Sequence, residues 1–210
     1  MKQTHLTIVA TVLTASILVG CSDPADSVHK SETSAPKQTS AAPAGAGKTY
    51  VVSPESKIGF VGSKVTGSHN GGFTNFSGAV SVADGKVVTP TEIKIEMAST
   101  WADADNLTGH LKSPDFFDAA KFPTSTFTVT GITAAEGGTN NVTGNLALHG
   151  VTNSISFPAK IEVADASVTV KAEFAINRKN FAINYPGKAD DLIRDNVVIK
   201  LDVTAAPGAK

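Results

Sequence analysis

From Tyr50 onward, apolar and polar side chains alternate with a period of two along most of the chain. Ile93 and Ile95 alternate with charged residues, and Phe127 and Val129 alternate with threonines. A period of two puts successive side chains on opposite faces of a β-strand. One apolar and one polar face in segment after segment is typical of antiparallel sheet with a single buried side. The fold class is therefore predicted to be all-β.

Turn-forming residues separate the alternating segments. Asp84 and Gly85 form a pair favoured in two-residue β-hairpins. Between such turns we predict about eight strands, at residues 50–52 with 57–66, 72–83, 87–99, 124–133, 140–149, 153–163, 167–178 and 195–205.

Residues 103–120 break the alternation. Leu107 and Leu111 lie at helical spacing, Ser113 is a favourable N-cap, and Pro114 suits a first helical position. We expect a short helical insert here, which in a barrel can close one end.

The N-terminal residues resemble a bacterial lipoprotein signal. Lys2 precedes an apolar stretch, residues 6–19, that is too short to be a good membrane span and that leads into Leu-Val-Gly-Cys. The resemblance implies that residues 1–20 are removed and that Cys21 carries acyl chains such as palmitate. Ser22, in place of Asp, favours the outer membrane facing the periplasm. The alternative is an ordinary signal peptide followed by a chance cysteine.

Residues 22–47 are rich in Ser, Ala, Pro, Thr, Gly and Lys, with Val28 as the exception among large apolar residues. Such a composition buries too little surface to offset the entropy of ordering. We predict a flexible tether over residues 21–47, followed by one domain over residues 48–206.

The composition of the chain limits the classes of binding partner that we expect. The formal net charge is −1 and the pI is about 6.5, so we expect no nucleic-acid partner, which would require a basic patch. The single cysteine allows no internal disulfide. Ten Phe against two Tyr and one Trp indicate core or cavity lining, because Phe has no polar group to satisfy.

Several stretches are similar to the YceI-like family of lipid-binding proteins. They are residues 56–60, 72–78, 109–118, 122–127, 142–146, 149–152, 176–178 and 194–197. The most specific is Gly109-His110-Leu111-Lys112-Ser113-Pro114-Asp115-Phe116-Phe117-Asp118. The chain departs from the family's pattern at Asn145 and Ala147, which bears on ligand identity.

The resemblance implies an eight-stranded antiparallel, lipocalin-like barrel whose deep cavity holds a polyisoprenoid lipid, such as an isoprenoid quinone or phosphate. It also implies a homodimer. No other cofactor is expected.

The side chains of one parity are the candidates for the cavity wall. They are Phe60, Phe73, Phe76, Ile93, Ile95, Met97, Phe127, Val129, Val170, Phe174 and Ile176. The alternative is that they fill the barrel as an ordinary core.

The two arginines, Arg178 and Arg194, have planar guanidinium groups that suit phosphate or carboxylate. One interpretation is an internal ion pair, for example with Asp195, that ties the last strands together. The other is a clamp for a lipid head group.

The remaining polar residues carry no catalytic or metal motif. Asp103, Asp105, His110, Asp115 and Asp118 form an acidic cluster, but their spacing matches no metal-ligand pattern. His69, His110 and His149 lack a flanking nucleophile motif. We therefore predict no catalytic residue and no metal.

The function predicted is a periplasmic, lipid-anchored protein that binds an isoprenoid or similar amphiphile for sequestration or transport. The alternatives are an enzyme acting on a small apolar substrate in the same cavity, and a structural or partner-binding lipoprotein with a filled barrel.

Overall fold

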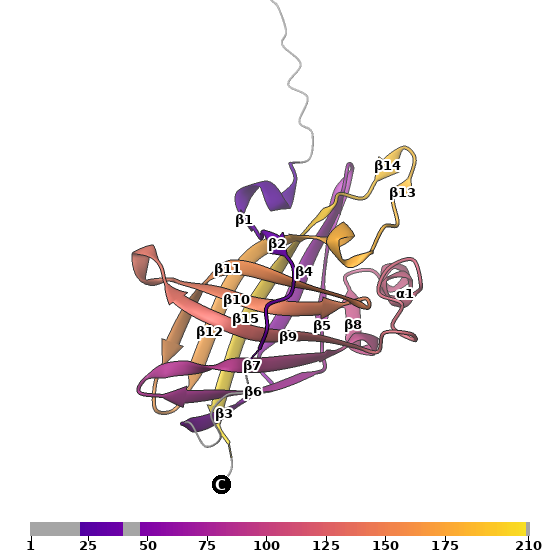
Figure 1. Ribbon diagram of the computed structural model, residues 1–210. Coiled ribbons are helices and arrows are strands. Elements are labelled where there is room, and N and C mark those ends of the chain that lie inside the picture. The colour runs from indigo at the N-terminus through magenta and orange to yellow at the C-terminus, as the bar shows by residue number, and fades with distance from the viewer. Residues whose placement is uncertain (1–21, 40–46, 209–210) are drawn as a thin grey trace, which may run out of the picture.

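A computed structural model describes residues 22–39 and 47–208 as a closed antiparallel β-barrel with one α-helix beside one end (Figure 1). The strands of the barrel are β3 (Lys48–Val52), β4 (Lys57–Lys64), β5 (Gly67–Phe73), β6 (Phe76–Ala83), β7 (Lys86–Glu96), β8 (Thr100–Ala102), β9 (Thr124–Ala134), β10 (Asn140–Leu148), β11 (Val151–Val163), β12 (Val168–Asn177) and β15 (Asn196–Pro207). The other elements are η1 (Pro24–Ser27), β1 (His29–Lys30), β2 (Thr33–Ser34), η2 (Met97–Ser99), α1 (Asp105–Lys112), η3 (Glu136–Gly138), η4 (Arg178–Phe181), β13 (Gly187–Lys188) and β14 (Asp191–Leu192).

The wall consists of eight strands, because β3 with β4, β5 with β6, and β7 with β8 are each one long strand with a break. Strand β3 pairs with β6 while β4 pairs with β5, and β6 pairs with β7 while β5 pairs with β8. Pairing of β12 with β15, from Val168 with Ala205 to Asn177 with Asn196, closes the barrel. The predicted all-β, eight-stranded, lipocalin-like barrel is confirmed.

Two hairpins follow from local chemistry. Asp84 and Gly85 have φ values of 51° and 71°, and His149 and Gly150 have 51° and 77°. Positive φ at both central residues matches the twist of the flanking strands. The Asp84–Gly85 hairpin was predicted, whereas the His149–Gly150 turn lacks the usual Asn or Asp before its glycine.

Strand β5 was largely missed, because Gly67-Ser68-His69-Asn70-Gly71-Gly72 has no apolar alternation. Tertiary packing explains the glycines. A Cβ on Gly71 would lie 2.3 Å from the Phe60 ring, so the large side chain of β4 requires the missing side chain on β5.

The helical insert is shorter than predicted. Helix α1 ends at Lys112, and Ser113 is its C-cap rather than the N-cap of a second helix. The Ser113 hydroxyl still accepts a hydrogen bond from the amide of Asp115, at 3.3 Å, but residues 114–120 form turns. No helix in the described ranges is long and apolar enough to cross a membrane.

Residues 22–39 lie on the barrel, so the prediction of a free tether is wrong for this part. Strands β11 and β12 pair between Lys160 with Lys171 and Val163 with Val168. Beyond this, β1 pairs in parallel with β12, and β2 pairs with β11. The segment therefore occupies the space between two diverging strands. The composition of this segment predicted no fixed structure, but the unpaired edges of β11 and β12 supply the hydrogen-bond partners that the segment lacks by itself.

The segment is also anchored by side chains. Ala25 is fully buried among Val61, Ala175 and Val198. The signal peptide over residues 1–20, Cys21 and residues 40–46 lie outside the described residues.

Candidate functional site

The inward side chains of the wall enclose an apolar cavity of about 270 Å³. Its wall combines alternate positions of nearly all the barrel strands, which the strand period directs inward. The lining includes Ile58, Phe60, Gly62, Phe73, Val80, Val87, Thr91, Ile93, Ile95, Leu111, Phe116, Phe117, Ser125, Phe127, Val129, Ile132, Val142, Leu146, Leu148, Ile155, Phe157, Ile161, Val170, Phe174, Ile176, Arg178, Ile183, Ile193, Val197, Ile199, Leu201 and Val203. The alternative of a completely filled barrel is therefore wrong.

Nine of the eleven predicted cavity residues line it, and Phe76 and Met97 do not. Phe76 borders an outer groove at the start of β6, beside the break between β5 and β6. Met97 is buried where β7 ends and η2 begins, so the strand alternation no longer sets its direction. Contact of the other nine with a ligand stays a prediction.

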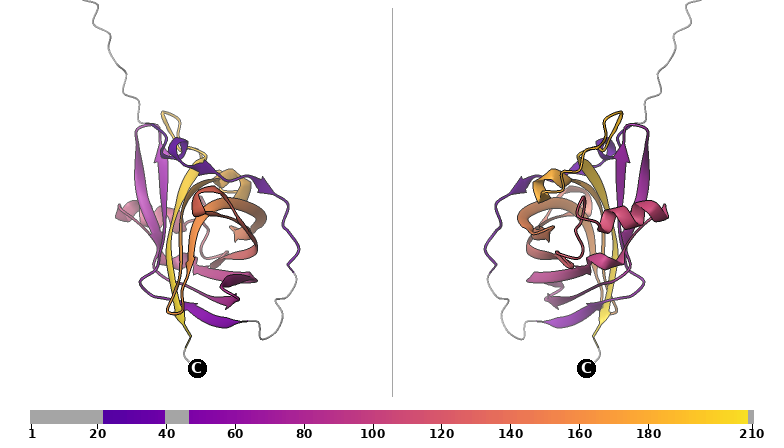
Figure 2. Two further views of the ribbon diagram at one scale, coloured as in Figure 1. Left: turned by 90° about the vertical axis from the view of Figure 1, so that its left-hand side faces the viewer. Right: turned by 90° about the vertical axis from the view of Figure 1, so that its right-hand side faces the viewer.

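One end of the barrel, here called the helix end, is covered by α1, residues 113–122, η4 and the β13–β14 hairpin (Figures 1 and 2). Phe60, Phe73 and Phe117 form an aromatic cluster there, with ring centroids 5.8 to 6.4 Å apart. Phe116 and Ile183 are buried beside them. The sequence indicated an insert that closes one end, and the structure adds the residues after η4 to this cover.

The opposite end is closed by a separate apolar cluster. Tyr50, Val80, Val82, Val168 and Ala205 are buried together. The Tyr50 hydroxyl donates to the carbonyl of Ala164, at 3.1 Å, which satisfies its polar atom. Apolar side chains therefore cover the cavity at both ends.

The hydroxyl groups of the lining are already satisfied within the protein. Thr91 donates to the carbonyl of Val88 at 3.0 Å, and Ser125 donates to that of Ala147 at 2.8 Å. Within the described residues, the lining holds one ionisable side chain, Arg178. The cavity thus suits a chain without polar groups along its length, because burying an unpaired polar group is costly.

Arg178 is buried and turned toward the protein. Its guanidinium donates to the carbonyls of Ile183 at 2.7 Å, Arg194 at 3.1 Å and Ile193 at 3.2 Å. Burial lowers the pKa of Arg178, and the carboxylate of Asp195, 3.6 Å away, opposes this. Three of its five N–H donors thus hold the segment from η4 to β15, as the interpretation of an internal tie expects, and a contact with a lipid head group stays a prediction.

Arg194 faces the N-terminal segment. Its Nη1 lies 3.6 Å from Oδ2 of Asp23, and Oδ1 of the same carboxylate accepts a hydrogen bond from Ser63, at 3.5 Å. Arg194 thus joins the start of η1 to the β14–β15 connection.

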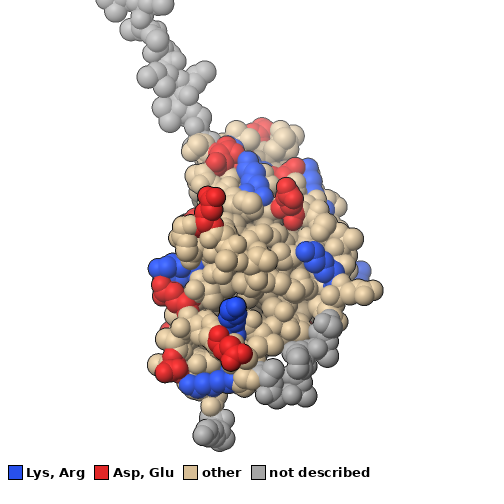
Figure 3. Space-filling view, turned by 60° about the vertical axis from the view of Figure 1, so that its left-hand side comes forward, with Lys and Arg blue, Asp and Glu red and all other residues tan. Residues whose placement is uncertain are grey.

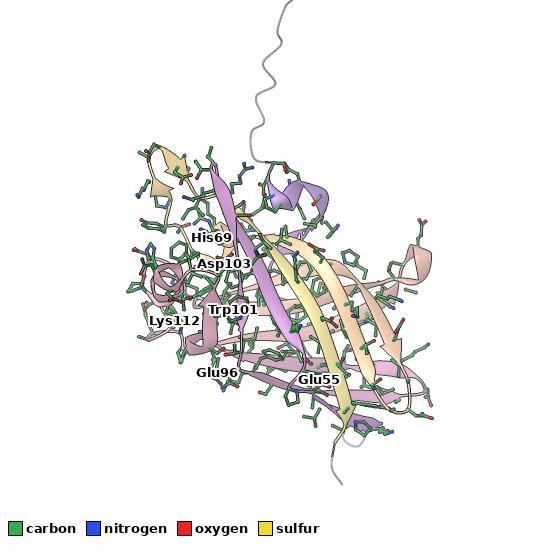
Figure 4. All side chains as sticks on the ribbon, turned by 180° about the vertical axis from the view of Figure 1, so that it is seen from behind. Glu55, His69, Glu96, Trp101, Asp103 and Lys112 are labelled. Carbon is green, nitrogen blue, oxygen red and sulfur yellow. The ribbon has the colours of Figure 1, made fainter. Side chains whose placement is uncertain are left out.

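The acidic cluster separates into pairs. His69 lies 2.7 Å from Asp103, beside β5 as Figure 4 shows, and His110 lies 2.9 Å from Asp115. The amide of Asn70 and the His69 ring lower the pKa of Asp103. Across the described part of the chain, no three His, Cys, Asp or Glu side chains group in a way that could hold a metal ion.

On the face seen in Figure 3, basic and acidic side chains are interspersed. Exposed ion pairs of the barrel strands include Lys171 with Asp202 and Lys160 with Glu162. This face offers no extended basic patch for a polyanion.

Comparisons with known proteins agree with this architecture. Residues 50–205 match a family model, that of the YceI-like domain. A curated protein of Azotobacter vinelandii (strain DJ / ATCC BAA-1303), named as a UPF0312 protein, is 31% identical over 105 residues, which are 46% of this chain and 53% of that protein. The chain thus matches about half the length of this relative.

Solved structures share the fold. Burkholderia cenocepacia BcnA has a TM-score of 0.64 and 25% identity, over 72% of this chain and 97% of that one. A polyisoprenoid binding domain from Saccharophagus degradans, implicated in plant cell wall breakdown, has a TM-score of 0.62 and 18% identity, over 77% and 99%. The Campylobacter jejuni YCEI protein has a TM-score of 0.55 and 22% identity, over 66% and 85%.

Proposed function

Because the chain belongs to the YceI-like domain family and encloses an apolar cavity, we propose that it binds a chain-like lipid, of the isoprenoid class, inside its barrel. One observation carries this proposal: the cavity is apolar along its length, and the hydroxyls of Thr91 and Ser125 in its wall are internally bonded.

The energetics favour a slender ligand. The volume of about 270 Å³ lies near the lower limit of ligand pockets, so it accommodates one slender chain. Burying about ten chain carbons gains about 8 kcal/mol, which exceeds the lower values for the cost of immobilising a ligand, about 4 kcal/mol. The isoprenoid class is supported by the Saccharophagus degradans domain, which is described as polyisoprenoid binding.

Binding without catalysis is the role that the wall favours. An enzyme would place titratable groups against its substrate, but the one ionisable side chain of the described lining, Arg178, is held by three backbone carbonyls. We propose that the protein sequesters or carries its ligand and leaves it chemically unchanged.

We further propose that the mature protein begins at an acylated Cys21 and lies at the outer membrane, facing the periplasm. The support is the lipobox-like Leu-Val-Gly-Cys after the apolar residues 6–19, and Ser22 in place of Asp. Incorporation of labelled palmitate into the wild type and not into Cys21→Ser is the expected result. Equal labelling of both chains contradicts the anchor but leaves lipid binding untouched.

The decisive experiment on binding is organic extraction of the purified full chain, followed by mass spectrometry. We expect a prenyl lipid or quinone in near-stoichiometric amount. A clean protein that also fails to take up farnesol or a short-chain ubiquinone contradicts the proposal.

A further inference from the structure

Two of the most exposed large apolar side chains lie together at the helix end. Val65, at the tip between β4 and β5, is 55% exposed, and Leu192 in β14 is 50% exposed. The amide of Val65 donates to the carbonyl of Leu192, at 3.3 Å, which joins the two tips. Exposed apolar side chains that adjoin one another are candidates for an interaction site, whereas isolated ones are common on any surface.

This exposed pair lies close along the chain to residues that line the cavity. Ile193 lines the cavity, and its neighbour Leu192 points the other way, as strand alternation requires. On the other tip, Gly62 lines the cavity three positions before Val65. The exposed pair thus lies on the outer side of the same two segments whose inward residues line the cavity.

The N-terminal segment is held at the same place. Asp23 contacts Ser63 and Arg194, each two positions from one of the exposed apolar residues. Figures 1 and 2 show η1 at the end of the molecule that carries these tips, with the C-terminus at the other end. Cys21 precedes Asp23 by two positions, and an extended chain spans at most about 3.6 Å per residue. An acyl chain on Cys21 therefore enters a membrane within about 10 Å of this ion pair.

Charges of both signs surround the tips, with Lys188 and Asp190 on the β13–β14 hairpin and three ion pairs beside it. Lys64 bonds Asp191, Lys179 lies 2.9 Å from Asp195, and Arg194 lies 3.6 Å from Asp23. Contact with a surface here depends on apolar burial rather than on attraction to anionic lipid, so it is expected to change little with salt.

We propose that the helix end docks on a phospholipid bilayer, with Val65 and Leu192 inserted at the boundary between head groups and acyl chains. This orientation turns the helix-end cover of the cavity toward the membrane, so that an apolar ligand passing through this cover is exchanged without crossing water. The proposal rests on acylation of Cys21, as proposed above, and not on the identity of the ligand.

Depth-dependent quenching of a single tryptophan tests the orientation. The native Trp101 is replaced in a Trp101→Phe background, and tryptophan is introduced as Val65→Trp, Leu192→Trp or Val51→Trp. Val51 is the matched control, because it is 48% exposed but lies on β3 at the opposite end. Each full-length lipoprotein is reconstituted into phosphatidylcholine vesicles whose acyl chains carry bromine.

We expect a blue shift and strong quenching for tryptophan at positions 65 and 192, unchanged by high salt, and neither for position 51. Equal quenching at all three positions, or none at 65 and 192 in protein that floats with the vesicles, overturns the docking. Protein that does not float overturns it as well, by removing the anchor. Neither result touches ligand binding, which extraction and mass spectrometry measure separately.

Discussion

Replacing Gly62 by phenylalanine fills the cavity with little disturbance to the wall. A Cβ at Gly62 has no heavy atom within 4 Å, and the position lines the cavity near the helix end of β4. Glycine within a strand is also unfavourable by itself, so the substitution is expected to leave the melting temperature unchanged or to raise it slightly.

The loss of affinity follows from the volume that the ring occupies. The benzyl group displaces about six ligand carbons, at about 0.8 kcal/mol each. The resulting loss of about 5 kcal/mol corresponds to a Kd several thousand-fold weaker. Titration with a fluorescent polyene fatty acid, displaced by farnesol, measures this directly.

Gly131→Phe is the control. Gly131 lies in β9, its Cβ position is equally open, and it does not line the cavity. It should bind as the wild type does. If Gly62→Phe retains full affinity, the interior beside Gly62 does not hold the ligand. If both variants lose affinity equally, the loss is not specific to the cavity. Either result refutes the reasoning.

Three further predictions concern the connections around the barrel. Arg178→Met leaves three carbonyls without their donor. It should lower the free energy of unfolding by about 3 kcal/mol, or the melting temperature by about 10 °C, and change the Kd for the ligand less than about threefold. A large loss of affinity at an unchanged melting temperature would instead assign Arg178 to ligand binding. Lys64 and Thr66 hold the pKa of Asp191 below its ordinary value. The contact of the β13–β14 hairpin with β4 is therefore fully stabilised above the ordinary pKa, and this stabilisation is lost as the pH falls through the lowered pKa. Hydrogen exchange of the Ile193 amide should show the loss in the wild type and not in Asp191→Asn, and an equal pH dependence in both proteins would contradict it. Ala25→Asp puts a charge into a fully buried site and should release residues 22–39 from the barrel. The release is measured as faster hydrogen exchange of the Ser31 amide, which bonds the carbonyl of Ala175 at 2.8 Å, and as protease cleavage in this segment. Retained protection of the amide would show that the segment tolerates the charge.

The predictions that failed share a cause. The Met97 prediction assumed that the alternation of Ile93 and Ile95 continues into η2. Phe76 lies three positions after Phe73, across the break between β5 and β6, so the period of two did not by itself place both on one face. Ser113 satisfies the composition of an N-cap, yet it ends α1, because the packing of Phe116 and Phe117 against the barrel directs the chain into turns. In each case the local sequence pattern did not show where a strand or helix ends, because tertiary packing sets that boundary.

Site residues that sequence reasoning missed come mainly from the cover of the helix end. Ile183 and Ile193 lie in stretches without regular alternation, so no period indicated them. Leu111 offered a signal, since its helical spacing from Leu107 predicted an apolar face on α1, although not that this face closes a cavity.

The sequence by itself determined the all-β class, the number of wall strands, the Asp84–Gly85 hairpin and most inward residues of the barrel. These depend on the period of two and on turn chemistry, which act between neighbours in the chain. Only the tertiary structure decided that the barrel stays hollow, that Arg178 holds loop carbonyls, and that residues 22–39 bridge β11 and β12. The Arg178 contacts depend on how the chain folds back over the next 5 to 16 positions. The hollow and the bridge depend on the space that remains between side chains, and on which strand edges stay unpaired, among residues more than a hundred positions apart. Such distances are set by closure of the barrel and leave no local pattern in the sequence.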